Sequence, residues 1–265
     1  MKLAPSSPPR PSPFEPMRSR SVLRWGGLLA SLATAAGLGA APPELSHREV
    51  RILSPVVTRR PDGGSRSPDI WIILHGRGGD ARNMAQLWDL LEDPKPVGIF
   101  PEGPYALPPS EGGPGWSWGP SSNDAALWAR ADAQVVEELL DLARRARQQH
   151  GGGRVFVLGF SQGASYASLV AARDPALLSG LIAYAGSLPL EHLPAADPGR
   201  SETRLRVFLA HGRKDGVIPF SESLKAQTAL ERGGHAVTVC AFVGGHTLDA
   251  EVLQRAQAWT RNPTP

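Results

Sequence analysis

Residues 155–164 constrain the fold of this chain more than any other stretch. They begin with a largely apolar run, which is typical of a strand buried on both faces. The pattern Gly159-x-Ser161-x-Gly163 follows at once, and small residues with helical spacing come next. A strand, this pattern and a helix are typical of a nucleophile elbow, a tight turn that exposes a serine hydroxyl at a sheet edge. We therefore predict that Ser161 is a nucleophile; the alternative is an ordinary strand-to-helix turn.

Both glycines of the pattern have a steric role in such a turn. We expect a Cβ at Gly159 or Gly163 to collide with the neighbouring strand or helix, and we expect the serine backbone to be strained. The helix that follows Ser161 points free N–H groups and the positive end of its dipole at the serine.

The rest of the chain, from about residue 46, alternates between strand-like and helix-like segments. Strands are predicted at residues 48–58, 69–74, 97–100, 155–160, 181–185, 205–210 and 237–242, and helices at residues 80–91, 124–149, 162–173, 221–232 and 248–261. This alternation predicts the α/β class, with a mostly parallel central sheet and helices on both faces. Residues 101–122, which are rich in Pro and Gly, are predicted as a long functional loop.

Composition limits the partners of the domain. The chain has 265 residues, of which 41% are apolar, and this is enough for one large domain with a core. Residues 1–41 hold five of the 28 basic residues and one of the 25 acidic residues, which leaves 23 basic and 24 acidic residues beyond them. The domain is thus near neutral, and its charge gives no reason to expect nucleic acid. Cys240 is the only cysteine, which excludes an intramolecular disulfide and a multi-cysteine metal site.

Residues 1–45 are predicted as a leader, and residues 46–265 as the folded domain. Pro and Ser dominate residues 1–16, where we expect disorder. From Met17, which we take as the true start, a basic region and a weakly apolar run to Ala41 resemble a secretory signal. We expect an exported protein with no stable membrane span in its mature form. The alternatives are a short membrane anchor and an unstructured extension on a cytoplasmic protein.

A serine hydroxyl needs a base that is held in one orientation. In this architecture the partners follow in the order Ser, Asp, His, each in a loop after a later strand. Asp215 follows the predicted strand 205–210, and His246 follows the strand that ends at residue 242. Because ligand crevices form at the carboxyl ends of such strands, we predict Ser161, Asp215 and His246 as a catalytic triad.

Four segments, residues 74–80, 159–163, 211–219 and 245–246, resemble the phospholipase/carboxylesterase family of α/β-hydrolases in sequence and in order. The resemblance covers about residues 67–261, and the family includes acyl-protein thioesterases and small bacterial esterases. It implies the α/β-hydrolase fold, with Ser161 as nucleophile, His246 as general base and then acid, and Asp215 as the residue that orients His246. It also implies an oxyanion hole from the backbone N–H groups of Arg77 and Gln162, and substrate contact by Trp116 and Trp118.

Two positions depart from the family pattern, because Arg77 replaces an apolar residue and Ala164 replaces a glycine. The Arg77 guanidinium either contacts an acidic or phosphate-bearing part of the substrate or is solvated beside the cleft. His75 and His211 follow strands in His-Gly turns, and we expect their side chains to brace these turns by hydrogen bonding.

The predicted function is hydrolysis of carboxylic esters with small to medium acyl chains through an acyl-enzyme. Thioesters and lysophospholipids are alternative substrates. The competing interpretations are an exported esterase for polymer-linked acyl groups and a non-catalytic binding protein with a hydrolase fold. No metal and no cofactor is expected, since no cluster has metal-ligand spacing and no phosphate loop is present. The expected partner is a small-molecule ester, and the protein is expected to be a monomer or a homodimer.

Overall fold

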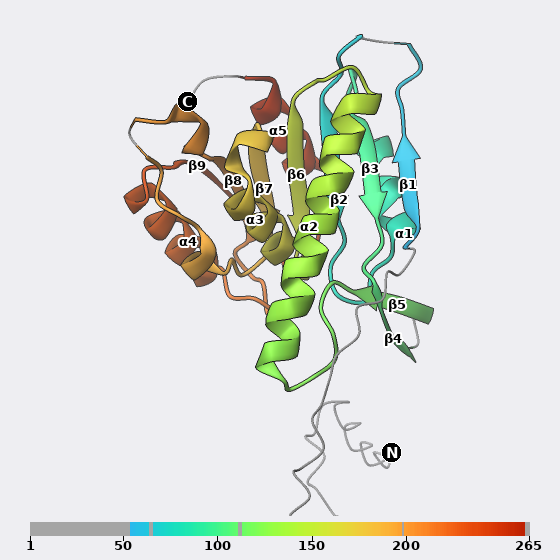
Figure 1. Cartoon of the computed structure of the whole chain (residues 1–265), viewed down its shortest axis with the longest axis vertical. Helices are drawn as coiled ribbons and strands as arrows, with labels where there is room; N and C mark the ends of the chain where they lie inside the picture. Colours follow the sequence, from blue (N-terminus) through green and yellow to red (C-terminus); the bar gives the residue numbers. More distant parts are fainter. Residues whose placement is uncertain (1–53, 64–65, 111–112, 198, 263–265) are drawn as a thin grey trace, which may run out of the picture. The chain divides into compact units, whose positions relative to one another are not determined.

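The computed structural model describes residues 54–63, 66–110, 113–197 and 199–262 (Figure 1). The predicted leader, its signal segment and the predicted domain start at residue 46 lie outside these ranges, so those expectations stay predictions.

A seven-stranded sheet runs through the domain in the order β1-β3-β2-β6-β7-β8-β9 (Figure 1). Its strands are β1 (Val56–Arg59), β2 (Ile70–Leu74), β3 (Val97–Pro101), β6 (Val155–Phe160), β7 (Gly180–Tyr184), β8 (Arg206–Gly212) and β9 (Ala236–Phe242). Strand β1 lies at one edge and is antiparallel to β3, whereas all other neighbours are parallel. The predicted mostly parallel sheet is confirmed.

Helices cover both faces of this sheet, as the alternation predicted. Helices α2 (Ala125–Gln149), α3 (Gln162–Arg173) and α4 (Ser221–Arg232) pack on one face. Helix α1 (Ala81–Ala85), the 3-10 helix η1 (Gln86–Leu90) and helix α5 (Ala250–Arg261) pack on the other. Three further 3-10 turns are η2 (Pro175–Leu177), η3 (Leu190–His192) and η4 (Ser201–Thr203). The α/β class is therefore confirmed.

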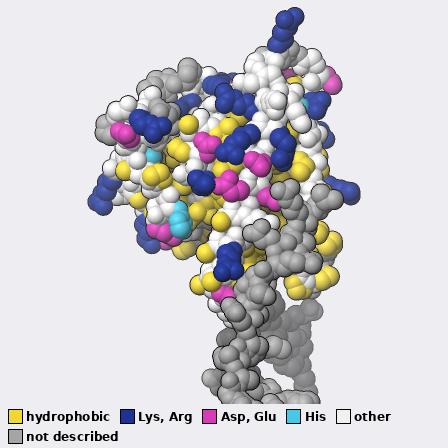
Figure 2. Space-filling view, in the orientation of Figure 1, with side chains coloured by type: hydrophobic (Ala, Val, Ile, Leu, Met, Phe, Trp, Pro, Cys, Tyr) yellow, Lys and Arg dark blue, Asp and Glu magenta, His cyan; other side chains and the backbone are white. Residues whose placement is uncertain are grey.

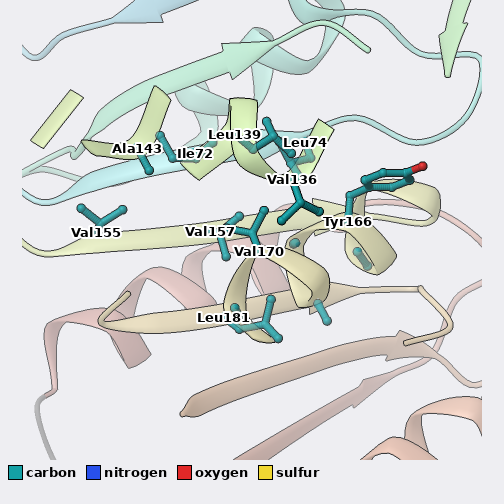
Figure 3. Close-up of a cluster of buried hydrophobic side chains, with 14 of the residues drawn as sticks. Ile72, Leu74, Val136, Leu139, Ala143, Val155, Val157, Tyr166, Val170 and Leu181 are labelled. Carbon is teal, nitrogen blue, oxygen red and sulfur yellow. The ribbon is translucent and has the colours of Figure 1, made fainter. Parts of the chain in front are cut away.

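Strand β2 shows why the sheet needs both layers of helices. Its side chains alternate in direction, so Ile72 and Leu74 pack with α2 and α3 (Figure 3), while Trp71 and Ile73 pack with α1 and α5. All four are at most 2% exposed. Burying a side chain of this size stabilises the fold by about 1.5–3 kcal/mol. A strand with one polar face would leave one of these layers without a surface to pack on.

The boundaries of α2 follow from its sequence. The Asp124 carboxylate accepts hydrogen bonds from the backbone N–H groups of Ala126 and Leu127, which satisfies two donors that a helix start leaves free. At the other end His150 is the C-cap, and three glycines follow it. The prediction for residues 124–149 is confirmed.

The predicted loop at residues 101–122 is wrong in part. The structure forms a hairpin there from β4 (Tyr105–Ser110) and β5 (Gly113–Ser117), beyond the carboxyl end of β3 (Figure 1). Pro108 and Pro109 lack N–H donors, and the pairing register shifts between Leu107 and Ser110. Such a strand has neither regular hydrogen bonding nor clean alternation, so its sequence is typical of a loop.

Acidic and basic side chains are interspersed over the face formed by α2, α3 and α4 (Figure 2). Ion pairs join several of them, including Arg144 with Asp174 and Arg173 with Glu137. Among the residues that the structure describes, no helix is both long enough and apolar enough to cross a membrane.

Candidate active site

Ser161 lies in the turn between β6 and α3 with an unusual backbone. Its φ is 54° and its ψ is −119°, a region that costs a residue with a Cβ about 1–3 kcal/mol. A Cβ at Gly159 would lie 2.0 Å from the Gly163 carbonyl oxygen, and one at Gly163 would lie 2.4 Å from the Leu74 carbonyl oxygen. The predicted steric role of both glycines is confirmed. The Ser161 side chain makes no capping bond to α3, so its hydroxyl is available for another partner.

That partner is His246, whose Nε2 lies 2.9 Å from the Ser161 hydroxyl oxygen. The other ring nitrogen, Nδ1, lies 2.7 Å from Oδ2 of Asp215. Since the carboxylate only accepts hydrogen bonds, Nδ1 carries the proton and donates it, which leaves Nε2 as the acceptor for the serine hydroxyl. The structure thus brings together three residues that are spread over 85 positions of the sequence.

Two loops hold Asp215 beside His246. Asp215 follows β8 and His246 follows β9, and backbone bonds from Arg213 N–H to the Phe242 carbonyl and from Lys214 N–H to the Gly244 carbonyl, both 2.9 Å, join the loops. A Cβ at Gly212 would meet the Gly245 carbonyl oxygen at 2.4 Å, so the loops are in close backbone contact.

The Asp215 carboxylate is buried and held ionised. Burial alone raises the pKa of this carboxyl. The hydrogen bonds from His246 and from the backbone N–H groups of Ile218 and Val217 outweigh burial, and the pKa of Asp215 lies below its usual value. An anion therefore remains beside the His246 ring at neutral pH and accepts the hydrogen bond from its Nδ1.

The turn after β2 lies against Ser161. A Cβ built on Gly76 would be 3.3 Å from the Ser161 Cβ, so Arg77, the next residue, is adjacent to the serine. In the described part of the chain, neither the Arg77 backbone N–H nor the Gln162 backbone N–H has a protein acceptor. The structure thus leaves two free donors close to the Ser161 hydroxyl.

Hairpin β4–β5 fixes this turn, and the sequence did not reveal the contact. The Gly78 N–H donates to the Trp116 carbonyl at 2.8 Å, and the Trp116 N–H donates to the Gly79 carbonyl at 3.0 Å. Gly115 packs so closely that a Cβ there would lie 2.6 Å from the Gly78 carbonyl oxygen. The glycines at 78, 79 and 115 are the only sequence signal of this backbone contact.

The Gln162 side chain ties the elbow to the same hairpin. Its Oε1 accepts from the Trp118 backbone N–H at 3.2 Å, and its Nε2 donates to the Ser117 hydroxyl at 3.0 Å. The Ser117 hydroxyl in turn donates to the Gly119 carbonyl at 2.7 Å. Sequence reasoning missed this role because Ser117 and Gln162 are 45 residues apart.

The two tryptophans predicted to contact substrate differ in burial. Trp116 is half-buried, which leaves part of its ring accessible next to the turn. Trp118 is 1% exposed, its indole N–H donates to the His75 carbonyl at 2.8 Å, and its ring packs on His75 and Tyr166. The prediction of substrate contact is wrong for Trp118, because its side chain is enclosed in the core.

His75 braces its turn, as expected. Its Nε2 accepts from the Gly103 N–H at 2.9 Å, and its Nδ1 donates to the Gly76 carbonyl at 2.7 Å. Burial lowers the pKa of His75, so the ring is neutral. Each ring nitrogen has one partner, which fixes the tautomer.

The Arg77 side chain is exposed and has no hydrogen-bond or ion-pair partner within the described ranges. The nearest acid in sequence, Asp80, is already engaged, since its carboxylate caps α1 by accepting from the N–H groups of Arg82 and Asn83. The turn that lies against Ser161 therefore carries an unpaired cationic side chain.

A second cleft lies at the opposite end of the sheet, before β2, β3 and β6. Its charged groups are largely satisfied within the protein. Arg154 makes two hydrogen bonds to Asp69, at 2.9 and 2.7 Å, and the Lys95 ammonium lies over the Trp88 ring. Ligands of parallel sheets bind at the carboxyl ends of the strands, so we place the candidate site at Ser161. No group of three or more metal-ligating side chains occurs among the described residues.

Comparison with known proteins agrees with this geometry. A family model for Phospholipase/Carboxylesterase matches residues 62–262, well over half of the chain. The chain belongs to this family. The predicted resemblance is confirmed, and with it the α/β-hydrolase fold, so this phospholipase/carboxylesterase family member is a hydrolase of the esterase and thioesterase type.

Individual relatives are distant. A protein of Oryza sativa that bears the name "Probable carboxylesterase" is 29% identical over 206 residues, which cover 73% of this chain and 86% of that protein. Acyl-protein thioesterase 1 of Saccharomyces cerevisiae is 24% identical over 174 residues, which cover 59% of this chain and 74% of the yeast protein. The crystal structure of the Bacillus cereus carboxylesterase superposes with a TM-score of 0.64 at 20% identity and covers 80% of this chain and 95% of that one, which shows the common fold.

Proposed function

We propose that the protein hydrolyses carboxylic esters through an acyl-enzyme on Ser161. One observation carries the proposal: His246 accepts from the Ser161 hydroxyl through Nε2 while it donates to Asp215 through Nδ1. This is the arrangement that lets a histidine remove the serine proton.

In the first half of the reaction the Ser161 oxygen attacks the ester carbonyl carbon as its proton moves to Nε2 of His246. The oxyanion of the tetrahedral intermediate accepts hydrogen bonds from the backbone N–H groups of Arg77 and Gln162. His246 then gives its proton to the leaving alcohol or thiol, and the acyl group stays on Ser161. In the second half, water loses a proton to His246 and attacks the acyl carbon. The bond from that carbon to the Ser161 oxygen breaks, His246 gives its proton to this oxygen, and the carboxylic acid leaves.

A fluorophosphonate probe tests the nucleophile, with Ser165 as the matched control. Ser165 lies on α3 four positions after Ser161, and its hydroxyl donates to the Ser187 carbonyl rather than to a base. We expect the probe to label wild-type protein and Ser165→Ala, but not Ser161→Ala. We also expect Ser161→Ala to lose hydrolysis of p-nitrophenyl acetate by at least about 10³-fold, with little change in Tm. Folded wild-type protein that is not labelled would favour the non-catalytic binding protein instead.

We further propose that the substrate carries an anionic group near the scissile bond. The support is that Arg77, whose side chain is exposed and unpaired among the described residues, follows Gly76 in the turn that lies against Ser161. Its test compares monomethyl succinate, which is anionic, with methyl butyrate, a neutral ester of similar shape. We expect Arg77→Gln to lower kcat/KM about 10-fold for the first ester and less than about twofold for the second, since a charge-assisted hydrogen bond contributes about 1.5–3 kcal/mol. Arg82→Gln, an exposed arginine on α1, is the control. Equal effects on both esters would contradict the role of Arg77.

The acyl or alcohol portion is proposed to be small to medium and apolar. Val217 is 69% exposed and Val243 is 83% exposed, and they lie on the loops of Asp215 and His246. Together with the half-buried Trp116 they offer apolar surface beside the triad. A series of p-nitrophenyl esters from acetate to laurate, run beside an acyl thioester, measures both chain length and leaving-group preference. Activity that rises steadily to laurate would contradict the proposed chain length.

Export of the protein is also proposed, on the signal-like segment at residues 17–41. An exported enzyme would meet polymer-linked acyl groups, which are the alternative substrates. N-terminal sequencing of protein from the native cell tests this proposal, and an intact N-terminus in the soluble cell fraction would contradict it.

A further inference from the structure

His211, the last residue but one of β8, also reaches the Asp215 carboxylate. Its Nε2 lies 3.2 Å from Asp215 Oδ2 and 2.8 Å from the Ile218 carbonyl oxygen. Its Nδ1 lies 2.7 Å from the Ser223 hydroxyl oxygen on α4. The His211 side chain is fully buried, as is that of Asp215, so the ring cannot contact substrate. The Phe220 ring packs edge-on against it at 5.9 Å.

The partners of His211 define its tautomer. A backbone carbonyl can only accept, so the proton must be on Nε2, which donates it to the Ile218 carbonyl. The 3.2 Å approach of Nε2 to Asp215 Oδ2 is a close contact beside this bond. In the neutral ring Nδ1 is then an acceptor, and the Ser223 hydroxyl donates to it. Ser223 is 4% exposed, so water does not compete for this bond.

Three donors hold the Asp215 carboxylate, and the His211 ring lies against it. Oδ2 receives the N–H group of His246 at 2.7 Å, and Nε2 of His211 lies 3.2 Å from the same oxygen. Oδ1 receives the backbone N–H groups of Val217 and Ile218, both at 2.9 Å. Ile218 therefore links the two side chains, because its carbonyl accepts from His211 while its N–H donates to Asp215.

We propose that His211 and Ser223 are positioning residues for the triad, so that a chain of five side chains runs Ser223–His211–Asp215–His246–Ser161. This proposal rests on the proposed function, because it assigns His211 a role in the same reaction. Asp215 must keep one orientation while His246 gains and loses a proton. The His211 ring lies against the carboxylate and holds the Ile218 peptide, whose N–H donates to Asp215. The bond from Ser223 fixes the orientation of the His211 ring.

A ring that only braces the loop would affect stability and not turnover. The chain offers a control for that case in His235, which is 6% exposed and is bonded through both nitrogens, to the Leu205 N–H and to the Pro194 carbonyl. His235 has no contact with the triad among the described residues. Its substitution should therefore cost stability alone.

The first experiment measures kcat and KM for p-nitrophenyl acetate together with Tm. For His211→Phe, which keeps a ring but no donor, we expect kcat to fall about 10- to 100-fold with KM within about twofold, the size found for outer partners of other active-site histidines. His211→Gln retains an N–H near the Nε2 position and should recover part of the loss. Ser223→Ala should lower kcat several-fold, and His235→Gln should lower Tm without lowering kcat. Wild-type kcat in folded His211→Phe would overturn the proposal, and so would wild-type kcat in folded Ser223→Ala if His211→Phe does not fold.

The second experiment asks whether His211 acts through Asp215. In an Asp215→Ala background, the addition of His211→Phe should cause no further loss of kcat, because the group that it positions is absent. Losses that multiply would show that His211 does not act through Asp215 and would overturn the proposal.

The third experiment is made on wild-type protein. Nitrogen-15 and proton NMR of the histidine rings should show the proton of the neutral His211 ring on Nε2, with assignments from the single variants. A neutral His211 ring that carries its proton on Nδ1 would overturn the proposal. If the proposed function itself fails, wild-type protein is neither labelled by the fluorophosphonate probe nor active. If only this inference fails, wild-type protein is labelled and the His211 variants are as active as wild type.

Discussion

One methyl group added at Gly115 should move the Arg77 N–H, one of the two proposed oxyanion donors, away from the rest of the site. In Gly115→Ala the new Cβ would lie 2.6 Å from the Gly78 carbonyl oxygen and 2.9 Å from the Gly78 Cα. Both contacts are with backbone, which cannot rotate away as a flexible side chain can. An ordinary contact of about 3.4 Å requires strand β5 and the turn at Gly78 to separate by about 0.8 Å.

That separation has two consequences of different size. It stretches the two backbone hydrogen bonds that join Trp116 to Gly78 and Gly79, each of which contributes about 1 kcal/mol. A loss of about 2 kcal/mol lowers the Tm of a domain of this size by about 4–8 °C. It also moves the Arg77 N–H, one residue away, from the oxyanion. A displacement of about 1 Å costs roughly 10²-fold in rate, and complete loss of one such donor costs about 10²- to 10³-fold.

The assay is kcat/KM for p-nitrophenyl acetate beside thermal unfolding, with Gly216→Ala as the matched control. A Cβ at Gly216 meets no atom within 4 Å, although Gly216 is next to Asp215. We expect Gly115→Ala to lose at least about 30-fold in kcat/KM while it remains folded at 25 °C, and Gly216→Ala to stay within about twofold of wild type. Wild-type kcat/KM in Gly115→Ala would refute the reasoning that the hairpin holds the Arg77 donor in place.

Two further predictions concern protons. The pKa of Asp215 is lower in the folded protein than in the unfolded chain, where it is about 4. The ionised carboxylate therefore stabilises the fold above about pH 4, and this stability is lost as pH falls through the folded pKa. In urea titrations the difference in unfolding free energy between wild type and Asp215→Asn should therefore shrink from pH 5 to pH 2. A difference that stays constant over this range would contradict the lowered pKa. At pH 7, kcat should be about 10⁴-fold lower in the variant. The pKa of His75 is lowered by burial, so the unfolded chain binds a proton more readily than the fold below about pH 6.5, and stability should fall from pH 7 to pH 5. His75→Gln should be less stable than wild type at pH 7 and should lack this part of the slope; an unchanged slope would contradict the assignment.

The sequence predicted most of the fold because its signals are local. A run of apolar residues before Ser161 and a capping aspartate at Asp124 each act within a few positions, and the strand and helix that they predict are present. The hairpin β4–β5 was missed because its stability comes from contacts with the turn at Gly78, which a local pattern does not record.

The triad residues could be found because each follows a strand, and parallel strands bring their carboxyl ends to one edge. Trp118 was misassigned because the resemblance places the whole region around it at the substrate groove and does not say which way each ring points. Strand β5 ends at Ser117, and the ring of Trp118 beyond it enters the core. The contact of His211 with Asp215 depends on how the loop closes around Ile218, and no spacing rule predicts that closure.

The positions of β6 and β9 in the sheet give the two halves of the proposed triad different resistance to local unfolding. Strand β6, which leads into Ser161, has hydrogen-bonded neighbours on both sides, β2 and β7. Strand β9, which leads into His246, is an edge strand that pairs with β8 alone, and Cys240 is its only fully buried position. Edge elements exchange their amide hydrogens through local opening before the central strands do. Under mild heat or denaturant the base would detach from the nucleophile while the central sheet persists, so catalytic activity would disappear at a lower temperature than secondary structure.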